Sequence, residues 1–167
     1  MKSDILEDLL RPGLRLVICG TAAGKRSAEL GAYYAGPGNK FWGIMHEIGL
    51  TGERLSPLDW REIDRYGIGF TDMAKAHFGS DADLPAHAFD AARLRGAIAQ
   101  FRPAALAFNG KKAAQMFYGR SAIDYGPQPA IEQTAIWVLP STSGAASGAW
   151  SPLPWRQMAE SLARFRL

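Results

Sequence analysis

Small polar residues follow three apolar runs of this chain. The loops that begin after Gly20, Gly110 and Pro140 are rich in glycine, serine, threonine or asparagine. If the apolar runs are parallel strands, their carboxyl ends meet at one edge of a sheet, which is where ligands bind in such folds. The positions of these loops therefore predict one binding site built from three distant segments.

The first loop is close to a phosphate-binding loop but departs from it. Only three residues separate Gly20 from Gly24, whereas a nucleotide-binding loop needs four, and Arg26 follows Lys25 where that loop has serine or threonine. The mismatch argues against a nucleoside triphosphatase.

The third loop carries hydroxyl groups that are candidates for a nucleophile. Ser141, Ser143 and Ser147 follow an apolar run, but the G-x-S-x-G turn of serine hydrolases is absent. We favour hydroxyls that cap the loop or contact phosphate groups.

Apolar runs and helical periodicity alternate along the chain that must position these loops. Strands are predicted at residues 14–20, 67–73, 104–110 and 135–141, and helices at 3–10, 40–50, 56–65, 89–102, 111–119 and 153–165. Residues 20–38 and 78–88 are predicted to be loops. The alternation indicates an α/β fold with a mostly parallel sheet, in one domain over residues 1–167.

Composition excludes several classes of protein. The 167 residues are 47% hydrophobic and 21% charged, as in ordinary globular proteins, and the net charge of +3 is compatible with a polyanionic partner. Cys19 is the only cysteine, so no disulfide forms within the chain, and His46, His77 and His87 lack metal-ligand spacing. No apolar stretch approaches the ~20 residues that span a bilayer, and the acidic first residues are unlike a signal peptide. We expect a cytoplasmic protein without a metal or a membrane contact.

Five segments, in order, resemble the uracil-DNA glycosylase superfamily between residues 8 and 160. They read GTAAGKRSA, YYAGPGNKFW, GIGFTD, AFNGKKA and LPSTSGAAS. The chain is most similar to the mismatch-specific uracil/thymine-DNA glycosylase branch and shares features with the hypoxanthine-DNA glycosylase branch. The resemblance implies a three-layer sandwich with a four-stranded sheet. It also implies base flipping out of DNA and hydrolysis of the N-glycosidic bond, without a cofactor, a metal or an obligatory protein partner.

The same resemblance assigns a catalytic residue. Ala22 stands where the mismatch-specific branch has the asparagine that positions the attacking water, and alanine cannot bind water through its side chain. In the hypoxanthine branch the catalytic asparagine precedes the FW pair, which is Asn39 here. The alternative for Asn39 is a plain N-cap of the following helix.

Further site residues follow from the matched segments. Tyr34, with Tyr33 as second choice, matches the aromatic that stacks on the flipped base. The alternative for Tyr34 is a ring that fills the core. Asp72 matches a residue that reads the base edge. The alternative for Asp72 is an N-cap or a salt bridge with Lys75. The remaining base-binding candidates are Thr21, Ala22, Asn109 and Ser141.

The residues expected to bind the DNA backbone lie in the same loops. They are Gly24, Lys25, Arg26, Lys111, Thr142, Ser143, Gly144, Ala145 and Ser147. Ala145 stands where the mismatch-specific branch inserts an apolar wedge into the duplex. Because alanine is a poor wedge, the chain is expected to tolerate single strands.

Three functions remain open at this point. The leading one is a monofunctional DNA glycosylase for deaminated bases: uracil first, then hypoxanthine, xanthine or mismatched thymine. The second is a catalytically weak or silent protein that binds damaged DNA, which Ala22 favours. The third is an unrelated α/β hydrolase. The preferred base and the oligomeric state are left undecided.

Overall fold

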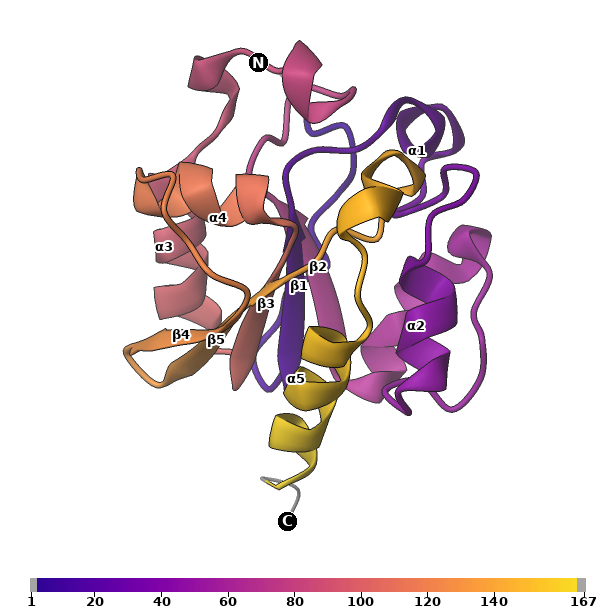
Figure 1. Cartoon of the computed structure of the whole chain (residues 1–167), viewed down its shortest axis with the longest axis vertical. Coiled ribbons are helices and arrows are strands. Elements are labelled where there is room, and N and C mark those ends of the chain that lie inside the picture. Colours follow the sequence, from indigo (N-terminus) through magenta and orange to yellow (C-terminus); the bar gives the residue numbers. More distant parts are fainter. Residues whose placement is uncertain (1–2, 165–167) are drawn as a thin grey trace.

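A central sheet of five strands organises the molecule, as the computed structural model in Figure 1 shows. The structure describes residues 3–164, apart from the side chain of Ser147. The strands are β1 (Leu16–Gly20), β2 (Ile68–Asp72), β3 (Ala105–Asn109), β4 (Gly126–Ile131) and β5 (Thr134–Leu139), in the order β2-β1-β3-β5-β4. The first four strands of this order are parallel, and β4 runs antiparallel to β5. The predicted α/β fold with a mostly parallel sheet is confirmed, with five strands rather than four.

Helices cover both faces of the sheet. They are α1 (Lys25–Leu30), α2 (Phe41–Glu47), α3 (Ala91–Phe101), α4 (Lys111–Tyr118) and α5 (Leu153–Ala163), and the 3-10 segments are η1 (Pro57–Tyr66), η2 (Asp81–Asp83), η3 (Ala86–Ala88) and η4 (Gly144–Ala149). Buried side chains of α2, η1 and α5 pack on one face of the sheet, and those of α3 and α4 pack on the other. The result is the expected three-layer arrangement.

Alternation along the strands explains why the sheet is buried on both faces. Leu16 and Ile18 of β1 point into the first core, and Val17 and Cys19 point into the second. All five residues of β1 are buried, as a central parallel strand requires.

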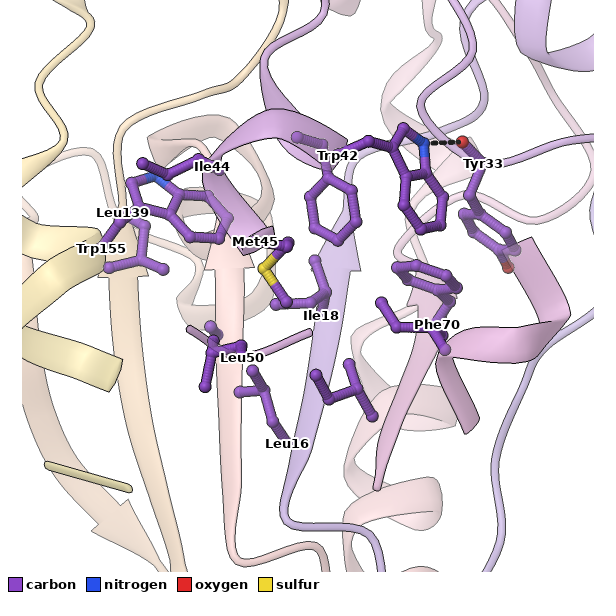
Figure 2. Packing of buried hydrophobic residues seen from close by; sticks show 14 of the residues in the cluster. Leu16, Ile18, Tyr33, Trp42, Ile44, Met45, Leu50, Phe70, Leu139 and Trp155 are labelled. Carbon is purple, nitrogen blue, oxygen red and sulfur yellow. Dashed lines mark hydrogen bonds between the residues drawn. The ribbon is translucent and has the colours of Figure 1, made fainter. Parts of the chain in front are cut away.

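Aromatic rings fill much of the first core, part of which Figure 2 shows. Tyr33 stacks on Phe70 with ring centroids 4.6 Å apart, and the indole nitrogen of Trp42 donates to the Tyr33 carbonyl at 3.0 Å. The indole nitrogen of Trp155 likewise donates to the carbonyl of Pro140 at 3.0 Å. These bonds fix the segments that lead to and from the sheet edge where the predicted loops lie.

The predicted N-terminal helix is wrong. Residues 3–10 form no helix: the chain bends at Ile5 and Leu6, and Leu9 and Phe70 exchange backbone hydrogen bonds of 2.9 and 3.0 Å. The amide of Ile5 also donates to the carbonyl of Lys75 at 2.7 Å. Pairing along β2 satisfies the backbone, so this short segment has no need of the costly first turn of a helix.

Other elements also differ from expectation. Residues 20–38 and 78–88 are not continuous loops, because the first contains the short helix α1 and the second contains η2 and η3. The helix predicted at residues 56–65 is the 3-10 segment η1. The strand β4 was not predicted, since its sequence GPQPAI has few strand-forming residues. No described helix meets the length and hydropathy needed to cross a membrane.

Candidate active site

A cleft of about 1080 Å³ lies at the carboxyl edge of the parallel strands. Gly20 and Asp72 are paired at the ends of β1 and β2, and Asn109 and Leu139 are paired at the ends of β3 and β5. The loops that leave these strands gather at the upper end of the sheet in Figure 1. The cleft is lined by every site residue predicted from the sequence except Ser147, whose side chain lies outside the described part of the chain.

Gly20, Asp72 and Tyr34 form the floor of the cleft. A Cβ atom on Gly20 would lie 2.7 Å from Oδ1 of Asp72 and 3.0 Å from the Tyr34 hydroxyl. Both oxygens therefore occupy the space that any larger residue than glycine would need. This close approach places a carboxyl and a phenol side by side at the end of the central strand.

Burial changes the acidity of Asp72. The side chain is 3% exposed, and desolvation raises the pKa of this carboxyl to about 7, helped by the negative charge of Asp8. The positive charges of Lys75 and Arg93 oppose the rise, as does a hydrogen bond from the Gly20 backbone. At neutral pH Asp72 is thus present in both protonation states, so it can donate or accept.

Tyr34 is held in an unusual conformation. Its φ of +54° lies in the left-handed region, which is uncommon for residues other than glycine and is often found at functional sites. Its ring stacks on Phe41 with centroids 4.4 Å apart. The hydroxyl is buried, and burial together with the negative charge of Asp72 raises its pKa well above the usual value, whereas the neighbouring side chain of Asn109 opposes the rise. The phenol therefore lies among Asp72 and Asn109 beneath the surface of the cleft floor.

Asn39 caps the helix that follows it. Its Oδ1 accepts a hydrogen bond from the amide of Phe41 at 3.0 Å, and α2 begins at that residue, one later than predicted. The N-cap position of α2 is Lys40, so Asn39 satisfies the first amide of the helix from one residue further out. An amide carbonyl has two lone pairs, so Oδ1 can accept a second hydrogen bond, from a water in the cleft.

Asn109 joins the end of β3 to the third loop. Its Oδ1 accepts from the amide of Thr142 at 3.0 Å, and its Nδ2 donates to the Thr142 hydroxyl at 2.9 Å. The side chain of Thr142 has no exposed surface. Its hydroxyl accepts one hydrogen bond within the protein, and the predicted contact of this side chain with a phosphate stays a prediction.

Short local hydrogen bonds shape the rest of the third loop. The Ser141 and Ser143 hydroxyls accept from the amides of Ser143 and Ala145 at 3.2 and 3.3 Å. The carbonyl of Thr142 accepts from the amide of Lys40 at 2.8 Å, which ties this loop to the segment that holds Asn39. Ala145 is exposed.

The first loop is fixed by its neighbour after β2. The Thr21 hydroxyl donates to Asp81 at 2.8 Å, and Ala23 pairs with Phe78 in a short parallel bridge. These bonds leave the α1 cations at the surface. Lys25 is exposed, and Arg26 pairs with Glu29 at 3.1 Å.

A partly buried polar cluster, which the sequence did not predict, holds the backbone of Asp72 at the cleft floor. Asp8 accepts from Lys75 at 2.8 Å, from Arg93 at 3.0 Å and from the hydroxyl of Thr71 at 2.7 Å. Arg93 also donates to the backbone carbonyl of Asp72 at 2.5 Å. Lys75 thus pairs with Asp8 rather than with Asp72. No local pattern could have signalled this cluster, because its members are far apart in the chain.

The described residues include no group of three histidine, cysteine or acidic side chains that could hold a metal ion. His77 and His87 lie in the connection after β2 with ring centroids 5.6 Å apart, and His46 lies in α2. Cys19 is fully buried, and burial raises the pKa of its thiol. The lining of the cleft presents carboxyl, phenol, amide and hydroxyl groups.

Comparison with known proteins supports the expected relationship. The family model described as the Uracil DNA glycosylase superfamily matches residues 7–161. Among solved structures, the chain resembles the solution NMR structure of a Methanosarcina acetivorans protein provisionally assigned as a uracil DNA glycosylase. The two share 20% sequence identity and a TM-score of 0.66 over 97% of this chain and 98% of the other.

Proposed function

Because this chain belongs to the uracil DNA glycosylase superfamily, we propose that it hydrolyses the N-glycosidic bond of deaminated bases in DNA, with uracil as the main substrate. Water adds a hydroxyl group to the C1′ carbon of the deoxyribose, the electron pair of the C1′–N bond leaves with the base, and the proton that the water loses neutralises the base anion. The reaction is monofunctional, because water rather than an amine of the protein attacks the sugar.

The observation that carries this proposal is the pair of oxygens over Gly20. Departure of the base develops negative charge on the base and positive charge on the sugar, and aimed donors stabilise such a separation. The protonated form of Asp72 can donate to an oxygen or nitrogen of the flipped base, whereas its ionised form would repel the developing anion. The hydroxyl of Tyr34, next to Asp72 and Asn109, supplies a second donor beside it.

Asn39 positions the attacking water in this proposal. It lines the cleft, and its Oδ1 already accepts one hydrogen bond, from the amide of Phe41. Its second lone pair accepts a hydrogen bond from the water, which orients the water oxygen toward the sugar. Asn39 thereby takes the place of the side chain that Ala22 lacks.

The neighbouring residues bind the base and the backbone. The base is surrounded by Thr21, Ala22, Asn109 and Ser141. Of these, Asn109 acts mainly by holding the third loop in place. The backbone contacts come from Gly24, Lys25, Arg26, Lys111, Ser143, Gly144, Ala145 and Ser147.

Ala22 favours a second candidate function. It lines the cleft but offers no polar side-chain atom. A protein that flips and holds damaged bases without cleaving them would need the same cleft but no side chain that positions an attacking water.

A panel of oligonucleotides separates these two functions. Matched strands carry uracil, hypoxanthine, xanthine or a mismatched thymine, and the assay measures abasic product in a single turnover. We expect the fastest product formation from uracil. Binding of all strands without abasic product from any of them would instead support the silent binder.

A further inference from the structure

Two exposed aromatic rings line the mouth of the cleft. Phe78 is 51% exposed and Tyr125 is 37% exposed, and both belong to the cleft lining. The other large apolar side chains that are exposed within the described residues do not line it; they are Leu30, Leu58 and Leu153. The exposed aromatic rings are thus both at the cleft. The resemblance to the glycosylase superfamily assigned a role to neither of them.

The sheet topology places the two rings on opposite sides of the cleft floor. Phe78 follows β2, which is one outer strand, and its segment is fixed by the bond from the amide of Gly79 to the carbonyl of Ala23 at 2.9 Å. Tyr125 precedes β4, the other outer strand. Because β4 is antiparallel, its first residue pairs with Val138 near the end of β5, so Tyr125 reaches the same carboxyl edge. Gly20 and the central strands lie between them.

A cation lies near each of the two rings. Asp81 and Asp83 line the cleft on the same loop as Phe78, but Phe78 also pairs with Ala23, which Lys25 follows by two residues in the same lining. On the other side the ammonium of Lys111 lies 4.4 Å from the ring centroid of Tyr125. Each side of the cleft therefore offers an aromatic ring and a cation, and successive nucleotides of one DNA strand present a flat base and a phosphate.

We infer that Phe78 and Tyr125 stack on unpaired bases on the two sides of the flipped nucleotide, and that single-stranded DNA is the preferred substrate form. This inference rests on the proposed function. Every base has a face that stacks on an aromatic ring, so such contacts do not require a particular sequence. In a duplex the neighbouring bases are already paired and stacked. The single methyl group of Ala145 is also too small to fill the gap that a flipped base leaves.

Binding to a strand that cannot be hydrolysed tests the inference. A short fluorescent oligonucleotide with a stable abasic analogue is titrated by anisotropy, as a single strand and as a duplex. We expect the parental protein to bind the single strand more tightly. Phe78→Ala and Tyr125→Ala should each weaken single-strand binding by about fivefold or more, with a smaller effect on the duplex. Phe78→Trp, which keeps an aromatic face, should bind like the parental protein.

Two exposed leucines provide matched controls. Leu58 and Leu153 are 68% and 58% exposed and lie outside the cleft, so Leu58→Ala and Leu153→Ala should leave binding unchanged. Thermal melting by circular dichroism checks that all variants fold. The inference is overturned if the aromatic variants bind like the leucine variants, or if they lose single-strand and duplex affinity equally.

Uracil release, measured separately, keeps the two proposals apart. A parental protein that binds single strands through both rings but releases no uracil supports this inference and contradicts the proposed function. A protein that releases uracil, and whose single-strand binding is unaffected by either substitution, contradicts the inference alone.

Discussion

Asn39 combines a structural and a proposed chemical role in one amide. Asn39→Ala removes the acceptor for the attacking water as well as the cap of α2. We expect single-turnover excision to fall by about a hundredfold or more, since groups of this kind contribute 10²–10⁴-fold, while DNA affinity changes little. The measurement is quenched-flow analysis of abasic product under excess enzyme.

A matched variant separates the two roles of Asn39. Asn39→Asp keeps an oxygen that both caps the helix and accepts from water, so it should retain the stability and most of the rate. Loss of the cap alone costs about 1 kcal/mol of unfolding free energy. If Asn39→Ala melts earlier but excises uracil at the parental rate, Asn39 is only a cap.

Asp72 should make excision depend on pH. Its pKa is raised to about 7, so the protonated donor is lost as the pH rises through that value. We expect the single-turnover rate to be high below neutral pH and to fall above it. Asp72→Asn donates at every pH, so this fall should be absent from its profile. An identical fall in both proteins would assign the pH dependence to another group.

Stability provides an independent check on Asp72. A carboxyl whose pKa is raised by folding binds its proton more tightly in the folded state, so its contribution to stability decreases as the pH rises toward about 7. Asp72→Asn removes this cost. The variant should therefore gain more melting temperature at mildly alkaline pH than at acid pH, measured by calorimetry. An equal gain at both would mean that Asp72 titrates normally.

At the residue scale, the sequence predicted which residues lie at or after the strand ends, but their roles stay predictions. Asp72, Asn109 and Ser141 line one cleft because parallel strands end at one edge. The solvent exposure and the hydrogen-bond partners of these side chains could not be predicted from the sequence. Thr142 is buried and bonded to Asn109, a pairing that no sequence spacing indicates. Phe78 lines the cleft because its segment pairs with Ala23, which is distant in the chain.

At the scale of elements, the bond pair between β3 and the third loop should be a stability determinant. Asn109→Ala removes both bonds and leaves the amide of Thr142 buried without its acceptor. We expect a loss of about 1–3 kcal/mol in the free energy of unfolding, measured by urea denaturation.

The other partner supplies the comparison for this bond pair. Thr142→Val keeps the backbone bond to Oδ1 and loses only the hydroxyl, so it should cost less than Asn109→Ala. Equal stability of Asn109→Ala and the parental protein would show that the loop is held by other contacts.

Elements with strong periodicity were predicted, and elements set by pairing were not. The apolar strands β1, β3 and β5 and the helices α3, α4 and α5 lie where the pattern placed them, within a few residues. Residues 3–10 have an amphipathic sequence, yet the backbone of Leu9 pairs with Phe70 in β2. Whether such a segment forms a helix or pairs with a strand depends on a partner distant in the chain, and local periodicity does not identify that partner.

At the scale of the whole molecule, DNA binding should depend on salt. Lys25, Arg26 and Lys111 line the cleft of a chain with a net charge of +3. Each phosphate contact contributes about 0.9 to the slope of log affinity against log salt on a duplex and about 0.7 on a single strand. Lys25→Ala or Lys111→Ala should lower the slope by about that amount, measured by anisotropy over a salt series.

An exposed cation outside the cleft serves as the control for the salt series. Arg61 pairs with Glu7 on the surface and does not line the cleft, so Arg61→Ala should leave the slope unchanged. A parental slope near zero would contradict DNA binding through phosphates.

The two prolines of β4 bear on how the protein behaves at high concentration. An outer strand with free N–H groups is a template on which another molecule can add a strand, and from there aggregates grow. Pro127 and Pro129 have no N–H group to offer, and the opposite margin, β2, is occupied by Leu9. Both edge strands thus disfavour the addition of a strand from another molecule. The protein should therefore stay monodisperse at concentrations at which a sheet with unprotected edge strands would aggregate.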